Sequence, residues 1–250
     1  MNRYLNYFKN KLRDILRTPI VLENYFRDYF LFLKLSRKDN RGFRMGLGNL
    51  YPCIRDNTKE VSSDFHYIYH PAWAARIIAT TKPEFHIDVS SILYFSAIIS
   101  AFVPVKYYEF RKVGINLSNL TIEQANLLSL PFKDNSVKSI SCMHTVEHIG
   151  LGRYGDAIDS KGDLKAIAEL KRVLALGGSL LFVVPIGKSG IYFNAHRVYS
   201  YAQIMEYFSD LTLKEFTLIP KNNKIVYNAT KDLADKEDYG CGCFWFTKEK

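Results

Sequence analysis

The chain has 250 residues, a formal net charge of +9 and 48% hydrophobic residues, which is enough apolar material for one sizeable core and an extension. No apolar run reaches membrane-spanning length, and the N-terminus lacks the uninterrupted apolar stretch of a signal peptide. Cys142 falls in a predicted buried strand, and Cys241 and Cys243 lack the usual zinc spacing. We therefore expect reduced thiols and a cytoplasmic protein.

The positive charge is concentrated near the N-terminus. Residues 1–44 hold 11 Lys or Arg and 4 Asp or Glu, whereas the remaining residues hold 23 and 21. Apolar residues with helical rhythm predict one helical run up to Leu16 and a second from Leu22 to Leu33, separated by Pro19. We expect an extension, residues 1–50, that packs as a lid on a domain of residues 51–250. The alternative to a packed lid is that residues 1–44 contact the inner face of an anionic membrane peripherally. Nucleic acid is not an expected partner, because the rest of the chain is nearly neutral.

The rest of the chain alternates strands with helices. Apolar runs predict strands over residues 86–89, 105–110, 137–143 and 180–184, with closing strands over 211–219, 224–228 and 242–247. Glu169 to Leu174 form the last part of a predicted amphipathic helix, and Gly177 with Gly178 is expected to stop this helix. An irregular segment over 193–201 is expected to cover the pocket. This alternation predicts a doubly wound, mostly parallel α/β sheet.

A dense run of ionisable and glycine residues follows the third of these strands. It begins His144-Thr145-Val146-Glu147-His148, and such residues just past a buried strand are typical of a site at the carboxyl edge of an α/β sheet. His-x-x-Glu-His is also a zinc-hydrolase spacing. That interpretation is disfavoured because the motif needs a long helix, which Gly150 and Gly152 interrupt.

The flanking sequences resemble class I methyltransferases that use S-adenosylmethionine (SAM). The segments that carry the resemblance are residues 126–137, with Leu-Pro-Phe, and 169–185, with Arg-Val-Leu followed by Gly-Gly. Two further segments resemble the narrower DUF268 family. They are His-Ile-Gly-Leu-Gly-Arg-Tyr-Gly-Asp over residues 148–156 and Phe-Asn-Ala-His-Arg over residues 193–197. The resemblance covers roughly Tyr51 to the C-terminus. It implies a seven-stranded Rossmann-like sheet and SAM as cofactor, and it supplies no substrate.

The resemblance places the methionine end of SAM at Asp88, Ser90 and Ser91, and the sulfonium beside His144. The usual Gly-x-Gly is absent there, and a left-handed turn is harder for Ser90 than for glycine. An ordinary serine helix cap is the alternative.

Three further residues are expected to bind the nucleoside. Glu109 ends the second predicted strand and can accept hydrogen bonds from both ribose hydroxyls, unless it only pairs with Arg111. Asn126 can hydrogen-bond the adenine edge, and Leu127 can pack on the ring. The alternative for Asn126 is a simple turn residue.

Catalysis is expected from histidine, whose pKa lies near neutrality. We predict His148 or His196 as general base, with Glu147 or Asp156 as the orienting carboxylate. The residues expected to bind the acceptor are Arg153, Tyr154, Asn194 and Arg197. No bound metal is predicted, and an ion bridging His148, Asp156 and His196 is a weaker alternative.

These interpretations predict a SAM-dependent methyltransferase acting on a hydroxyl or amine of a small, hydroxylated and anionic acceptor. A nucleotide-linked sugar or surface-glycan precursor fits, which would place the enzyme in polysaccharide biosynthesis. One alternative is a non-catalytic SAM-fold module that binds a partner through residues 1–44. The other is an NAD-dependent oxidoreductase, disfavoured because Gly-x-Gly-x-x-Gly is absent after the first strand.

Overall fold

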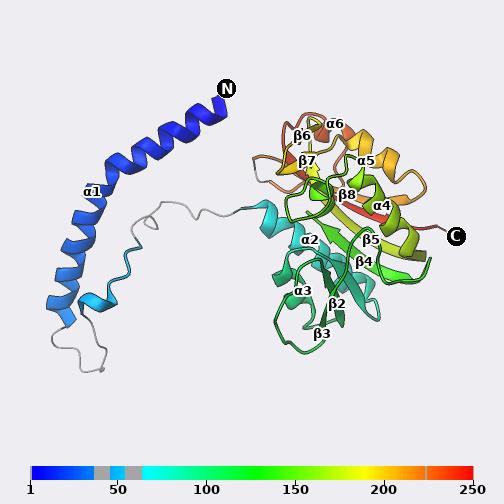
Figure 1. The fold of residues 1–250 in the computed structure, drawn as a ribbon, viewed down its shortest axis with the longest axis horizontal. Coiled ribbons are helices and arrows are strands. Elements are labelled where there is room, and N and C mark those ends of the chain that lie inside the picture. The colour runs from blue at the N-terminus through cyan, green and yellow to red at the C-terminus, as the bar shows by residue number, and fades with distance from the viewer. Residues whose placement is uncertain (1, 37–45, 54–63, 223, 250) are drawn as a thin grey trace. The chain divides into compact units, whose positions relative to one another are not determined.

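The computed structural model describes residues 2–36, 46–53, 64–222 and 224–249. The chain forms two compact units, Met1–Ser62 and Ser63–Lys250 (Figure 1). The sequence-based division at residue 50 lies within the first unit.

The first unit is built on one long helix. Helix α1 (Asn2–Ser36) is followed by a short 3-10 turn, η1 (Leu47–Asn49). The expected break at Pro19 is wrong, because the helix continues through it. A proline removes one backbone hydrogen bond and bends a helix, and it does not have to end one. The apolar side chains up to Leu16 lie outside the described residues. No helix in the described ranges is long and apolar enough to cross a membrane.

The second unit is built on a seven-stranded sheet in the order β3-β2-β1-β4-β5-β9-β8. Its strands are β1 (His86–Val89), β2 (Val105–Glu109), β3 (Leu120–Gln124), β4 (Val137–Met143), β5 (Leu174–Ile186), β8 (Thr212–Ile219) and β9 (Gly240–Thr247). In this sheet β3, β2, β1, β4 and β5 pair in parallel, whereas β9 runs antiparallel to its two neighbours, β5 and β8. The predicted mostly parallel, seven-stranded sheet is confirmed.

Helices cover both faces of this sheet. They are α2 (His66–Thr81), α3 (Leu93–Ile99), α4 (Gly162–Val173), α5 (Tyr201–Tyr207) and α6 (Lys231–Ala234). Buried Trp73 of α2 and Phe95 of α3 belong to one apolar core, and buried Leu170 of α4 and Phe208 at the end of α5 belong to the other. The sheet is therefore doubly wound, as predicted.

Several sequence-based boundaries need correction. Helix α4 ends at Val173, and β5 begins at the next residue, so the Gly177-Gly178 pair lies inside a strand. Gly177 has a φ of +70°, and the register between β4 and β5 shifts at this point, so the pair forms a bulge. The 224–228 segment contributes only an isolated bridge at Val226, and β3 was not predicted. The segment 193–201, expected to be irregular, contains the short strand β7 (His196–Val198), which pairs with β6 (Gly190–Tyr192) just before it.

Candidate functional site

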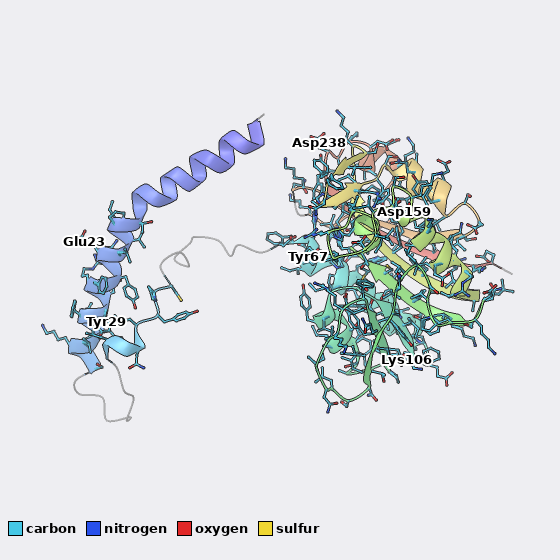
Figure 2. All side chains as sticks on the ribbon, viewed as in Figure 1. Glu23, Tyr29, Tyr67, Lys106, Asp159 and Asp238 are labelled. Atoms are coloured by element: carbon cyan, nitrogen blue, oxygen red, sulfur yellow. The ribbon has the colours of Figure 1, made fainter. Side chains whose placement is uncertain are left out.

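Two adjoining cavities form a cleft at the carboxyl ends of β1, β2 and β4. Their volumes are about 290 Å³ and about 540 Å³. Tyr67 and Asp159, both labelled in Figure 2, border the larger and the smaller cavity, respectively. The residues that line both cavities are Ser90, Glu109, Arg111, His144 and Tyr154. Ligands of open α/β sheets bind at this edge.

Asp88 lies beneath the cleft and does not line it. It is fully buried, its carboxylate accepts a hydrogen bond from Ser96 Oγ, and Ser141 Oγ donates to its Oδ1 at 2.7 Å. Burial raises the pKa of Asp88 to about 6, against the lowering effect of its serine partners. The structure therefore gives Asp88 a supporting position under the turn and not the expected direct contact with a cofactor.

Ser90 and Ser91 form the turn that lines the cleft. Ser90 has a φ of +54°, so a serine does adopt the left-handed conformation that this turn requires. Its backbone is held on both sides, because its N–H donates to the Tyr108 carbonyl at 2.8 Å and its carbonyl accepts from Thr145 Oγ1 at 2.9 Å. Helix α3 is capped at Ile92, without a side-chain cap. The serine-cap alternative is therefore not what forms.

Glu109 points a half-buried carboxylate at the junction of the two cavities. Its side chain is 14% exposed, it accepts from Tyr107 OH at 3.2 Å, and Arg111 Nε lies 3.5 Å away. The cleft position and the Arg111 pairing are both present, so neither interpretation excludes the other. One carboxylate oxygen can still accept further hydrogen bonds.

Asn126 and Leu127 line the smaller cavity. Asn126 Oδ1 accepts from the Leu128 N–H at 2.9 Å, which closes a turn, and buried Leu127 belongs to the apolar core. Asn126 is thus a turn residue that also borders the cavity. Phe110, which follows Glu109 directly, lines the same cavity and was not predicted, although its place at a strand end is a usable signal.

The His144–His148 motif forms a compact cluster and not a helix. Only a 3-10 turn, η2 (Val146–His148), follows β4, which argues against the zinc-hydrolase interpretation. His144 Nδ1 lies 2.9 Å from Glu147 Oε1, and His144 Nε2 lies 3.4 Å from Cys241 Sγ. Burial opposes the charged form of His144, but Cys241 and Glu147 favour it, and the net effect is a raised pKa.

The two predicted base candidates lie close together. His148 lines the smaller cavity, and its ring centroid is 6.5 Å from that of His196. His148 Nδ1 donates to the Ala195 carbonyl at 2.6 Å, and Glu147 Oε1 lies 3.9 Å from His148 Nε2. Burial lowers the pKa of both histidines. His196 does not line either cavity and instead packs against Tyr192.

The loop after His148 is closed by Asp156. Its carboxylate accepts from the backbone N–H of Gly150 at 2.6 Å and of Tyr154 at 3.3 Å. Gly150 has a φ of +82°, and a Cβ there would lie 2.0 Å from a backbone oxygen, so this close loop requires glycine. Asp156 borders the cavity, but its carboxylate is engaged by the loop backbone and does not orient His148.

Of the three further residues expected to bind the acceptor, Tyr154 lines both cavities, whereas Arg153 and Asn194 line neither. The guanidinium groups of Arg111 and Arg153 lie 4.9 Å and 5.1 Å from the centre of the Tyr154 ring. Arg153 also donates to the Ala195 carbonyl, and Asn194 is exposed. Cationic and aromatic groups are thus available here to an acceptor.

Arg197 does not bind an acceptor in this arrangement. It is 4% exposed, it donates to the Ile149 carbonyl at 2.7 Å, and its Nε lies 3.5 Å from Asp163 Oδ2. Its place on β7 points the side chain inward, which the sequence-based interpretation did not anticipate because that segment was expected to be irregular. Arg197 therefore joins the hairpin to the loop after η2.

Tyr67, His70 and Cys241 were missed by sequence reasoning. Tyr67 lines the larger cavity, and its ring stacks on His144 at 5.3 Å. Buried His70 and Cys241 lie beside His144. Nothing in their local sequence indicates this, because they lie on α2 and β9, far from His144 in the chain.

Comparisons with known proteins agree with this architecture. Residues 121–218 match the family described as Caenorhabditis protein of unknown function, DUF268. An uncharacterized protein of Methanocaldococcus jannaschii is 30% identical over 108 residues, which is 42% of this chain and 38% of that protein, so the match spans well under half of the relative.

Solved methyltransferase structures share the fold. A Bacillus halodurans protein assigned as a methyltransferase has a TM-score of 0.52 and 14% identity over 72% of this chain and 99% of its own. The 1,6-didemethyltoxoflavin-N1-methyltransferase of Burkholderia thailandensis, solved with S-adenosylhomocysteine, has a TM-score of 0.51 and 10% identity over 73% and 79%. The chain is thus methyltransferase-like in fold and DUF268-like in sequence, as expected.

Proposed function

We propose that this chain is a SAM-dependent methyltransferase that acts on a hydroxyl or amine of a small polar acceptor. The observation that carries the proposal is the cleft itself, where the Ser90 turn, the Glu109 carboxylate and the Asn126–Leu127 turn line one continuous surface. They follow β1, β2 and β3 of a sheet in which β9 runs antiparallel between β5 and β8. An NAD-dependent oxidoreductase is less well supported, because its sheet is usually parallel and its turn rich in glycine.

The residues present fit the cofactor. Glu109 can accept from two ribose hydroxyls, Phe110 and Leu127 offer apolar walls to a base, and the turn at Ser90 and Ser91 lines the remaining end. When bound, SAM supplies a methyl group activated by its positively charged sulfur.

His148 is the residue best placed to take the acceptor proton. Its Nδ1–H is committed to the Ala195 carbonyl, which leaves the Nε2 lone pair as the proton acceptor. Its lowered pKa keeps it neutral at pH 7, the state that a general base needs. His196 is the second candidate, one ring away.

The side chains around Tyr154 support one class of acceptor. The guanidinium groups of Arg111 and Arg153 both contact the Tyr154 ring, and this combination suits an anionic group joined to a ring. We propose a hydroxylated, anionic acceptor such as a nucleotide-linked sugar or a glycan precursor. Contact of residues 1–44 with an anionic membrane, which would bring the enzyme to lipid-borne glycans, stays a prediction.

Calorimetric titration of S-adenosylhomocysteine into the protein tests the cofactor assignment, with NAD as the comparison ligand. Glu109→Gln removes a charged hydrogen-bond acceptor worth about 1.5–3 kcal/mol, so affinity should fall about 10- to 150-fold. Tyr107 OH keeps its second partner, the Ser91 carbonyl at 3.0 Å, so the fold should survive. Glu123→Gln, on the exposed face of β3, is the matched control.

Three results would contradict the proposal. One is tight NAD binding without S-adenosylhomocysteine binding. Another is equal affinity in folded Glu109→Gln and wild-type protein. The third is binding of S-adenosylhomocysteine without methyl transfer to any nucleotide-sugar or glycan acceptor tested, which would favour the non-catalytic module.

A further inference from the structure

Three potential metal ligands from separate elements converge beside the cleft. They are His70 of α2, His144 after β4, and Cys241 of β9, and their ligand atoms all lie within 4.8 Å of one another. His70 and Cys241 are fully buried, and the His144 side chain is 7% exposed. Among the described residues, this is the one group of three histidine, cysteine or acidic side chains with such geometry.

His70 presents an unused lone pair to this cluster. Its Nδ1 lies 2.6 Å from the His66 carbonyl, which must accept a hydrogen from it. Its Nε2 is therefore unprotonated in the neutral ring, and within the described ranges this atom has no hydrogen-bond partner. An orphaned, fully buried polar atom costs about 1–3 kcal/mol, and the structure shows no compensating contact.

His144 is oriented in the same way. Its Nδ1–H faces Glu147 Oε1 at 2.9 Å, which directs Nε2 toward Cys241 Sγ, 3.4 Å away. A carboxylate behind a histidine is the common outer partner in metal sites, because it fixes the ring and strengthens the ligand. The pattern of two histidines, each held through Nδ1 by an oxygen, matches what a metal requires.

The spacing also fits. His144 Nε2 lies 3.4 Å from Cys241 Sγ. With bond lengths near 2.0–2.1 Å to nitrogen and 2.3 Å to sulfur, a tetrahedral zinc ion sets these two atoms about 3.6 Å apart. Two imidazoles and one thiolate form a donor set that favours zinc over magnesium or calcium.

We propose that His70, His144 and Cys241 bind one zinc ion. On binding, the proton held between His144 Nε2 and Cys241 Sγ is released to solvent, and the neutral imidazole and the thiolate coordinate the metal. Three protein ligands leave a fourth position for water or another donor. This departs from the sequence-based expectation of no bound metal, and its ligands also differ from the weaker alternative of an ion bridging His148, Asp156 and His196.

The ion would join α2 to the sheet directly behind the cleft. His70 is one helical turn from Tyr67, and both rings contact His144. The same ion would therefore fix Tyr67, a wall of the larger cavity, in place. The inference does not depend on methyl transfer.

Metal analysis of the full-length chain tests the proposal. The protein is reconstituted with one equivalent of Zn²⁺ and incubated with a chromophoric chelator of micromolar affinity. The chelator is then removed on a desalting column, and the zinc that stays with the protein is measured by inductively coupled plasma mass spectrometry. We expect about one zinc per wild-type chain, and less than about a fifth of this in Cys241→Ser and His70→Gln. Cys142→Ser removes an equally buried thiol from β4, which β5 separates from β9, and should keep the ion.

Two wild-type measurements avoid dependence on variant folding. Co²⁺ in place of Zn²⁺ should give a thiolate-to-cobalt charge-transfer band. Because Cys241 is buried in the folded chain, alkylation is compared with and without zinc in partly denaturing urea, where zinc should slow the modification of Cys241 and leave that of exposed Cys53 unchanged, as mapped by peptide mass spectrometry. The proposal is overturned if wild-type protein loses its zinc to the chelator, if Cys142→Ser loses it as readily as Cys241→Ser, or if the cobalt spectrum has no thiolate band.

Discussion

Single replacements of His86 and Asp88 should change the pH dependence of stability in opposite directions. The two side chains belong to one buried network under the cleft. His86 Nε2 lies 2.9 Å from Ser141 Oγ, whose hydroxyl donates to Asp88 Oδ1, and His86 Nδ1 lies 2.8 Å from Ser139 Oγ. Burial lowers the pKa of His86 to about 3 and raises that of Asp88 to about 6, despite the serine contacts.

The magnitudes follow from proton linkage. The pKa of His86 in the folded state lies below its unfolded value of 6.5. Its contribution to the free energy of unfolding is therefore complete above pH 6.5 and is lost as pH falls towards 3, at about 1.4 kcal/mol per pH unit. Asp88 has a folded pKa above its unfolded value of 3.8, so its contribution is complete below pH 3.8 and is lost as pH rises through 6. Between pH 6 and 4 the two slopes should nearly cancel in the wild type.

Urea unfolding at pH 7, 6, 5 and 4, followed by tryptophan fluorescence, measures this. As pH falls from 6 to 4, the free energy of unfolding of His86→Gln should rise by about 2–3 kcal/mol relative to that of the wild type, whereas that of Asp88→Asn should fall by a similar amount. Subtracting the wild-type value at each pH removes the contribution of surface carboxylates. Differences that stay constant with pH, or slopes of the same sign, would refute the assignment of a neutral histidine and a readily protonated carboxyl.

Two further outcomes concern the cleft. If His148 is the base, His148→Gln should lower turnover about 100-fold while S-adenosylhomocysteine still binds, and His196→Gln should lower turnover less than tenfold. The wild-type rate should fall only below pH 6.5, because the pKa of His148 is lowered. Near-normal turnover in His148→Gln would remove His148 from that role. Arg197→Met should cost about 3 kcal/mol of stability because it removes the cationic partner of buried Asp163, which then relies on its hydrogen bond from the Tyr199 hydroxyl. Arg153→Met, at an exposed position, should cost under about 1 kcal/mol, and equal costs in urea unfolding would contradict the structural role of Arg197.

The central strands were predictable because they are buried. β1 is buried throughout and β4 is buried apart from Lys138, and their bounds match the prediction. β3 was missed because it is an edge strand, largely exposed, with too little apolar content to give a pattern. The junction of α4 and β5 was misplaced because Leu174 continues the apolar face of the helix although it already pairs with Val137 of β4.

The site was predictable in position and less so in role. Topology brings residues after successive parallel strands to one edge, so Ser90, Glu109 and His144, which strand ends and the resemblance together indicated, line one cleft. Roles depend on which way a side chain points, and this left Arg197 misassigned. The His144 partners on α2 and β9 depend on long-range packing, which no local spacing encodes.

The Ser90 turn shows how this cleft forms without the expected glycine. A left-handed residue other than glycine costs about 1–2 kcal/mol, and here Ser90 Oγ donates to the Tyr108 carbonyl at 3.1 Å in return. Ser90→Gly should therefore change stability by less than about 1 kcal/mol, because relieved strain offsets the lost bond and the looser unfolded chain. Ser91→Gly, which removes the buried acceptor of the Met143 N–H, should cost about 1–3 kcal/mol. If thermal and urea unfolding show Ser90→Gly to be the more damaging change, the backbone of Ser90 is not what sets this turn.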